Sequence, residues 1–65
     1  MESKKNNIKV LLVEDEDFAR AMVGEMLNSS GITAISAKSV AQALAQIDDF
    51  DPHVVLTDLD LGNGP

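Results

Sequence analysis

Val54-Val55-Leu56-Thr57-Asp58-Leu59-Asp60 joins a short apolar run to two carboxylates. The uninterrupted run at 54–56 is typical of a strand that is buried on both faces of a parallel sheet. Asp58 and Asp60 then bring charge to the carboxyl edge of that sheet, where open α/β folds keep their ligand crevices. This stretch is therefore predicted to contribute both to the core and to a functional site.

A second apolar segment near the start of the chain ends in the same way. Ile8 to Val13 is interrupted only by Lys9, and it leads directly into Glu14-Asp15-Glu16-Asp17. If this strand lies parallel to the strand at 54–56, about 4.8 Å away, both acidic ends emerge at one edge of the sheet. Carboxylates concentrated in so small a volume predict a cation site.

The segment after the first strand is predicted to be a helix with one broad apolar face. Acidic residues at 15–17 suit its start, because carboxylates interact favourably with the exposed N–H groups and the helix dipole. Two rows at four-residue spacing form the predicted buried face: Phe18, Met22 and Met26, with Ala19, Val23 and Leu27 beside them. Gly31 is expected to end this helix in the left-handed conformation.

A second helix is predicted after a short strand at 33–37. Ser39 begins it, and Gln42 three residues later completes a capping-box pattern. Its predicted buried stripe is Val40, Leu44 and Ile47. Pro52 ends the helix, because proline disfavours helical geometry at the residue before it.

The expected order of strand, helix, strand, helix, strand predicts an α/β fold with right-handed crossovers and a parallel sheet. The segment at 33–37 alternates polar and apolar residues and is predicted to be an edge strand, which gives the strand order 2-1-3. This is a flavodoxin-like sheet truncated to β-α-β-α-β. Because the third strand would need a further neighbour, residues 1–65 are expected to be an N-terminal portion of a domain, with residues 1–7 disordered.

Composition narrows the classes of partner. Eleven acidic and five basic residues give a formal net charge of −6, which opposes binding to nucleic acid. The chain has no cysteine and one histidine, His53, so neither a disulfide framework nor a multi-histidine metal site is expected. No apolar stretch approaches the roughly 20 residues that span a bilayer, and the start lacks a secretory signal. A cytoplasmic protein without membrane contact is predicted.

The acidic ends of the strands suit phosphoryl chemistry with magnesium. Mg²⁺ takes one or two carboxylates together with waters and phosphate oxygens, and Asp15 and Asp58, with Glu14 close by, offer that set. Asp58 is placed as a nucleophile toward phosphorus, because carboxylates can form acyl phosphates. Asp60 is expected to offer its backbone carbonyl. The alternative is that residues 14–17 are only solvated acid at a helix start.

Two motifs suggest a family. V-L-L-V-E-D-E at 10–16, and D-P-H-V-V-L-T-D-L-D-L-G at 51–62, resemble the first half of the response-regulator receiver domain of two-component signalling. The resemblance implies that Asp58 accepts a phosphoryl group from a phosphohistidine on a sensor histidine kinase. It also implies that Asp15 is the main Mg²⁺ ligand, that Glu14 assists, and that Asp60 lends its main-chain carbonyl. Such a segment is expected to be a phosphoacceptor and not an enzyme.

Two other interpretations remain open. The sequence D-L-D after an apolar strand also resembles the first motif of haloacid-dehalogenase-type phosphohydrolases, in which Asp58 would be the nucleophile and Asp60 an acid–base. The chain lacks the receiver family's later strands, which carry a Ser or Thr and a Lys that contact the phosphoryl group. Its function is therefore expected to be impaired, and a non-functional fragment that self-associates through the third strand is the remaining possibility.

Overall fold

The computed structural model describes residues 8–57, and the disorder predicted for residues 1–7 lies outside this range. Five elements follow one another: β1 (Lys9–Val13), α1 (Asp17–Ser29), β2 (Thr33–Ala37), α2 (Val40–Phe50) and β3 (Val54–Thr57). Their kinds and their order are those predicted from the sequence. Neither of the two helices in this range is long and apolar enough to cross a lipid bilayer.

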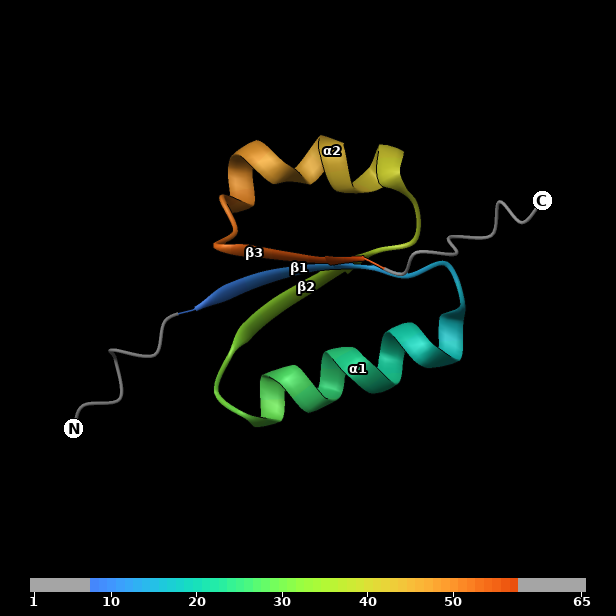
Figure 1. The fold of residues 1–65 in the computed structure, drawn as a ribbon, viewed down its shortest axis with the longest axis vertical. Coiled ribbons are helices and arrows are strands. Elements are labelled where there is room, and N and C mark those ends of the chain that lie inside the picture. The colour runs from blue at the N-terminus through green and yellow to red at the C-terminus, as the bar shows by residue number, and fades with distance from the viewer. Residues whose placement is uncertain (1–7, 58–65) are drawn as a thin grey trace.

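The three strands form one parallel sheet in the order β2-β1-β3. The helices α1 and α2 lie on opposite faces of this sheet (Figure 1), which makes three layers. Two right-handed crossovers are the usual way to connect strands in this order. The predicted flavodoxin-like topology, with strand order 2-1-3, is confirmed.

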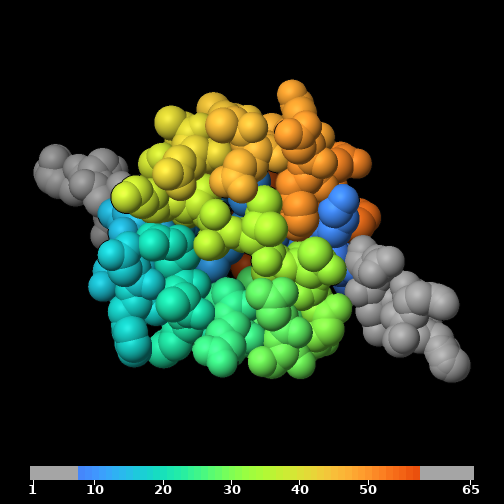
Figure 2. Space-filling view, turned by 180° about the vertical axis from the view of Figure 1, so that it is seen from behind, coloured from blue at the N-terminus to red at the C-terminus, as the bar shows by residue number. Residues whose placement is uncertain are grey.

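The core is centred on β1, the middle strand. Four consecutive residues of this strand, Val10 to Val13, are buried, and Leu11 has no exposed surface. Because neighbouring side chains of a strand point to opposite faces, Leu11 and Val13 share one face, where they cluster with Ala37 and Ala43. In Figure 2 the two helices flank β2 and largely cover β1. Coverage on both faces explains why the four residues after Lys9 in β1 are all apolar and buried.

The end of α1 is a Schellman motif, and the left-handed conformation predicted for Gly31 is confirmed. Gly31 has a φ of 90°, its N–H donates to the Asn28 carbonyl at 3.1 Å, and the Ile32 N–H donates to the Leu27 carbonyl at 3.1 Å. These bonds satisfy carbonyls that have no partner within the helix. The left-handed conformation at residue 31 is therefore what turns the chain from α1 into β2.

The start of α2 is capped by Ser39, as predicted. Its hydroxyl accepts the Gln42 N–H at 3.1 Å. The Gln42 side chain reaches back to the Lys38 N–H at 3.1 Å, one residue earlier than in a standard capping box. At the other end Asp51, with a φ of 53°, caps the helix just before Pro52.

The predicted buried face of α1 is partly wrong. Phe18, Met22 and Met26 are exposed, Met26 to 60%, whereas the neighbouring row of Ala19, Val23 and Leu27 is half-buried. The two rows lie about 100° apart around the helix. Because α1 packs against β1 and β2, only one row meets the sheet. The prediction that the two methionines pack in the core is therefore contradicted.

The predicted stripe of α2 is also partly wrong. Val40 and Leu44 are exposed, Leu44 to 62%, and Ile47 alone of the three packs against the core. Ala43 is the residue of α2 that is buried. A small side chain at this position allows the helix backbone to approach the sheet closely, while Val40 and Leu44 point away from the core.

β3 lies at an edge of the sheet, as the predicted order 2-1-3 requires, but the predicted burial of its side chains on both faces is wrong. Val54, Val55 and Leu56 are each 40–44% exposed. Within the described range, the helices contact β1 and β2 and do not contact β3. An apolar strand therefore forms one border of this sheet.

Candidate functional site

The carboxyl ends of β1 and β3 lie side by side. The register of these parallel strands pairs Val13 with Thr57, and each is the last residue of its strand. Glu14 and Asp15 follow the first of them directly. Asp58 and Asp60 follow the second along the chain but lie outside the described residues, so the roles predicted for them stay predictions.

Three of the four acidic residues after β1 have hydrogen-bond partners nearby, and two of them bind backbone N–H groups. Glu14 Oε2 accepts the Glu16 N–H at 3.1 Å, and Glu16 Oε1 accepts the Ala19 N–H at 3.0 Å as the N-cap of α1. Asp17 Oδ1 accepts a hydrogen bond from Arg20 at 2.7 Å. The Glu14 and Glu16 carboxylates thus satisfy N–H groups of the loop and of the first helical turn, which have no other backbone partner, whereas Asp17 binds a side chain.

Asp15 differs from its neighbours. It is exposed, and its carboxylate makes no hydrogen bond or ion pair with the described residues. No group of three or more His, Cys, Asp or Glu residues that could hold a metal ion occurs within residues 8–57. A metal site at this edge would therefore need further ligands, such as the predicted ones at Asp58 and Asp60.

Arg20 is a residue of this site that the sequence analysis missed. Its Nη1 donates to the Glu14 carbonyl at 3.0 Å, and its Nη2 makes the ion pair with Asp17. The spacing of Asp17 and Arg20, three residues apart in a helix, is the signal that could have indicated the pair. No sequence rule indicated the bond to the Glu14 carbonyl.

His53 is hydrogen-bonded to Lys9 at the amino end of β1, which is the end of the strand away from the acidic residues. Its backbone N–H donates to the Lys9 carbonyl at 2.8 Å, and its Nδ1 accepts the Lys9 N–H at 3.0 Å. The Lys9 ammonium lies over the Phe50 ring, 5.1 Å from the ring centre. These contacts tie the residue before β3 to the first residue of β1.

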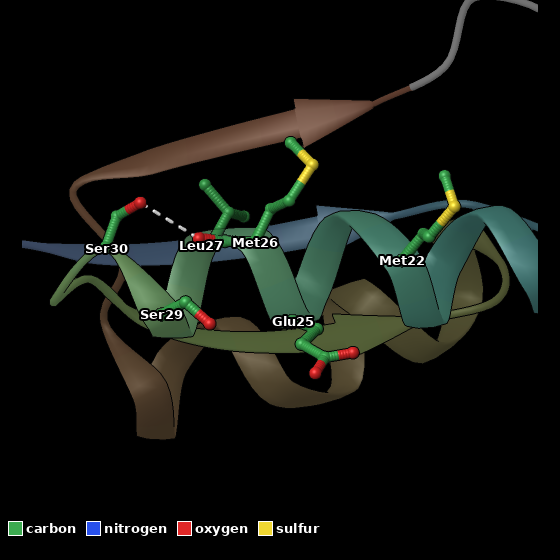
Figure 3. A pocket seen from close by; sticks show the side chains of 6 residues that line it. All are labelled: Met22, Glu25, Met26, Leu27, Ser29 and Ser30. Carbon is green, nitrogen blue, oxygen red and sulfur yellow. Dashed lines mark hydrogen bonds between the residues drawn. The ribbon is translucent and has the colours of Figure 1, made fainter.

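A shallow groove of about 530 Å³ runs along the second half of α1. Figure 3 shows Met22 and Met26 projecting from one side of the helix, with Glu25 and Ser29 on the other. The Ser30 hydroxyl, which also lines the groove, donates to the Met26 carbonyl at 3.0 Å. Since α1 runs back from the acidic edge, this groove lies away from Asp15, and it is not part of the site.

One similar protein is the protein-glutamate methylesterase/protein-glutamine glutaminase 1 of Syntrophomonas wolfei subsp. wolfei. The two sequences are 38% identical over 55 residues, which is 82% of this chain and 16% of that protein. The chain thus spans about a sixth of the length of this relative. No solved structure matches the chain.

The expectation that the chain is not an enzyme is contradicted, because this relative is named as an enzyme. The expectation was drawn from the acidic motifs alone. Those motifs concern one segment of 55 aligned residues and carry no information on catalysis elsewhere in a longer protein.

A family comparison covers both acidic motifs together. The model of the response regulator receiver domain matches residues 10–64, a range that includes Glu14, Asp15, Asp58 and Asp60. The parallel β2-β1-β3 sheet and the adjacent carboxyl ends of β1 and β3 agree with this match. The chain belongs to the response regulator receiver domain family.

Proposed function

We propose that this chain is the phosphoacceptor segment of a response regulator, and that Asp58 receives a phosphoryl group from a phosphohistidine of a sensor histidine kinase. The observation that carries the proposal is the family match over residues 10–64. The register that sets Val13 level with Thr57 supports it, because the next residues along the two strands are the predicted acidic ligands and the predicted acceptor.

The transfer requires little covalent chemistry from the protein. A carboxylate oxygen of Asp58 attacks phosphorus, the P–N bond of the phosphohistidine breaks, and the electron pair of that bond leaves with the imidazole nitrogen. The product is an acyl phosphate on Asp58. The chain contributes mainly by holding the acceptor and the surrounding charges in place.

The donor set at this edge fits Mg²⁺. Asp15 offers a carboxylate without a partner among the described residues, whereas Glu14 already accepts the Glu16 N–H through one oxygen. Asp15 would hold the ion directly, Glu14 would assist, and Asp60 would add its main-chain carbonyl. When bound, the ion offsets the repulsion between these carboxylates and the incoming phosphoryl group.

The partner and the location belong to the same proposal. A sensor kinase is the phosphodonor that receiver chemistry requires, and a cytoplasmic location goes with that role. The net charge of −6 supports the view that this segment does not bind nucleic acid. The activity in the name of the longer relative is that of the relative, and we propose no substrate for this chain from it.

Labelling by a phosphodonor tests the acceptor. The chain and its Asp58→Asn and Asp60→Asn variants are incubated with Mg²⁺ and a phosphohistidine donor, and the bound phosphoryl group is measured. Asp58→Asn should abolish labelling, because an amide cannot form the acyl phosphate, while Asp60→Asn should leave most of it. Asp48→Asn, which removes an exposed carboxylate of α2, is the charge-matched control.

Two outcomes would count against this assignment. Labelling that survives Asp58→Asn would remove Asp58 as the acceptor. Loss of turnover in Asp60→Asn, with water as the final acceptor in the wild type, would favour the haloacid-dehalogenase-like interpretation, in which the Asp60 side chain acts as acid–base.

A further inference from the structure

Arg20 is bonded to three of the residues between β1 and the first turn of α1. Its backbone N–H donates to the Glu16 carbonyl at 2.9 Å. Its Nη1 donates to the Glu14 carbonyl at 3.0 Å, and its Nη2 to Asp17 Oδ1 at 2.7 Å. The Arg20 side chain is only 21% exposed, against 86% for that of Asp17. Most of the arginine is therefore packed against the protein, and it is not a solvated surface charge.

The Glu14 carbonyl is the first carbonyl after β1. The N–H of Glu14 still extends the sheet, since it donates to the Ala37 carbonyl at 3.0 Å. Its carbonyl accepts from Arg20 instead of from a neighbouring strand. A backbone carbonyl that is partly buried needs a hydrogen-bond partner, so the guanidinium stabilises the turn out of the strand.

This carbonyl also belongs to the peptide group that joins Glu14 to Asp15. Because a peptide group is planar, holding its oxygen fixes the direction from which the chain enters Asp15. A guanidinium carries its donors in a rigid fork, so Arg20 can hold the Glu14 carbonyl and the Asp17 carboxylate at the same time. The position of Asp15 relative to α1 is thereby set through one side chain.

We propose that Arg20 is a positioning residue for magnesium binding at Asp15. The inference rests on the proposed function, since it concerns the same site. For the loss of Arg20, this role predicts a change in Mg²⁺ affinity opposite to the one that simple electrostatics predicts. A positive charge beside four carboxylates should repel a cation, so its removal should strengthen binding if Arg20 acted through charge alone. If Arg20 acts by positioning, its removal should weaken binding.

Calorimetric titration with Mg²⁺ separates the two effects. The full chain is compared with Arg20→Lys, which keeps the charge and loses the fork, and with Arg20→Gln, which loses both. Positioning predicts weaker binding in both variants, by about tenfold, as is typical when a group that orients a metal ligand is removed. Charge alone predicts unchanged binding in Arg20→Lys and tighter binding in Arg20→Gln.

Two controls keep the result interpretable. Lys9→Gln removes a positive charge from the amino end of β1, the end away from the acidic residues. It therefore reports the general effect of net charge on the Mg²⁺ affinity. Amide hydrogen exchange without metal shows whether the loop alone has loosened. The Glu16 N–H, which donates to the Glu14 carboxylate, should exchange faster in Arg20→Lys, while the amides of α2 should be unchanged. If Arg20→Gln fails to fold, Arg20→Lys decides the question.

The measurements distinguish a failure of the positioning role of Arg20 from a failure of the proposed function. Wild-type affinity in Arg20→Lys, or tighter binding in Arg20→Gln, would overturn the positioning role and leave the receiver assignment intact. No Mg²⁺ binding by the wild-type chain would overturn both. Labelling of Asp58 is measured separately, so it reports on the proposed function without Arg20.

Discussion

Four consecutive acidic residues follow β1, and the structure gives them different tasks. Glu14, Glu16 and Asp17 accept hydrogen bonds from the loop and from the first turn of α1. Asp15 accepts none from the described residues and is exposed. A carboxylate that is not needed by the backbone can be shared with a ligand at no cost to the fold, so Asp15 is the acid of this loop most suited to bind a cation.

Substitution of each acid should separate these tasks. Asp15→Asn should weaken Mg²⁺ binding by about tenfold or more, which corresponds to about 1.4 kcal/mol. Glu14→Gln should weaken it less, because glutamine keeps an oxygen that can accept the Glu16 N–H. Calorimetric titration of both variants measures the difference, and Asp48→Asn is the control for lost charge. Equal affinities for Asp15→Asn and the wild type would refute the role of Asp15.

At the scale of the elements, local signals control where the helices begin and end. The Schellman motif at Gly31 and the hydroxyl cap at Ser39 both involve residues close together in the sequence. Gly31 has a φ of 90°, and a Cβ added there would meet no atom within 4 Å. Any cost of a side chain at this position is therefore conformational and not a matter of packing.

Two glycine substitutions, one inside α1 and one just after its end, should have opposite effects on stability. Gly31→Ala should destabilise the fold by about 1 kcal/mol, because the left-handed conformation is unfavourable for a residue with a Cβ. Gly24→Ala should stabilise it by about 0.5–1 kcal/mol, since Gly24 is inside the helix and has open space around its Cα. Urea unfolding gives both free energies. A shift of the same sign in both variants would contradict this account of the helix end.

At the scale of the whole molecule, the two helices cover β1 and β2 and leave β3 at the border (Figure 1). Val54, Val55 and Leu56 are each 40–44% exposed. An apolar edge strand without charged residues is prone to pair with another copy. The negative net charge opposes this association, and salt screens that repulsion.

The chain is therefore expected to self-associate through β3, and more strongly at higher salt. Val55→Lys should reduce the association, because a charged side chain on an edge strand disfavours pairing. Ser36→Lys places the same charge on β2, at the other edge of the sheet, and should have a smaller effect. Sedimentation at several protein and salt concentrations measures both. A wild-type chain that stays monomeric and unfolds cooperatively would disprove the prediction.

Much of the fold follows from the sequence because its signals are local. The apolar strands, the cap at Ser39 and the left-handed residue at Gly31 each depend on neighbouring residues, and all were predicted correctly. The position of Glu14 and Asp15 at the end of β1 followed from the same strand pattern. The same pattern predicts that Asp58 and Asp60 follow the end of β3, and the roles of these two residues remain a prediction.

Only the tertiary structure decided which apolar rows are buried and how the acidic loop is held. A helix with two apolar rows can turn either toward a sheet, and the choice made by α1 depends on its contact with β1 and β2. The bond from Arg20 to the Glu14 carbonyl was likewise invisible in the sequence. A backbone carbonyl is present at every residue, so which one lacks a strand partner is determined only when the strands have paired.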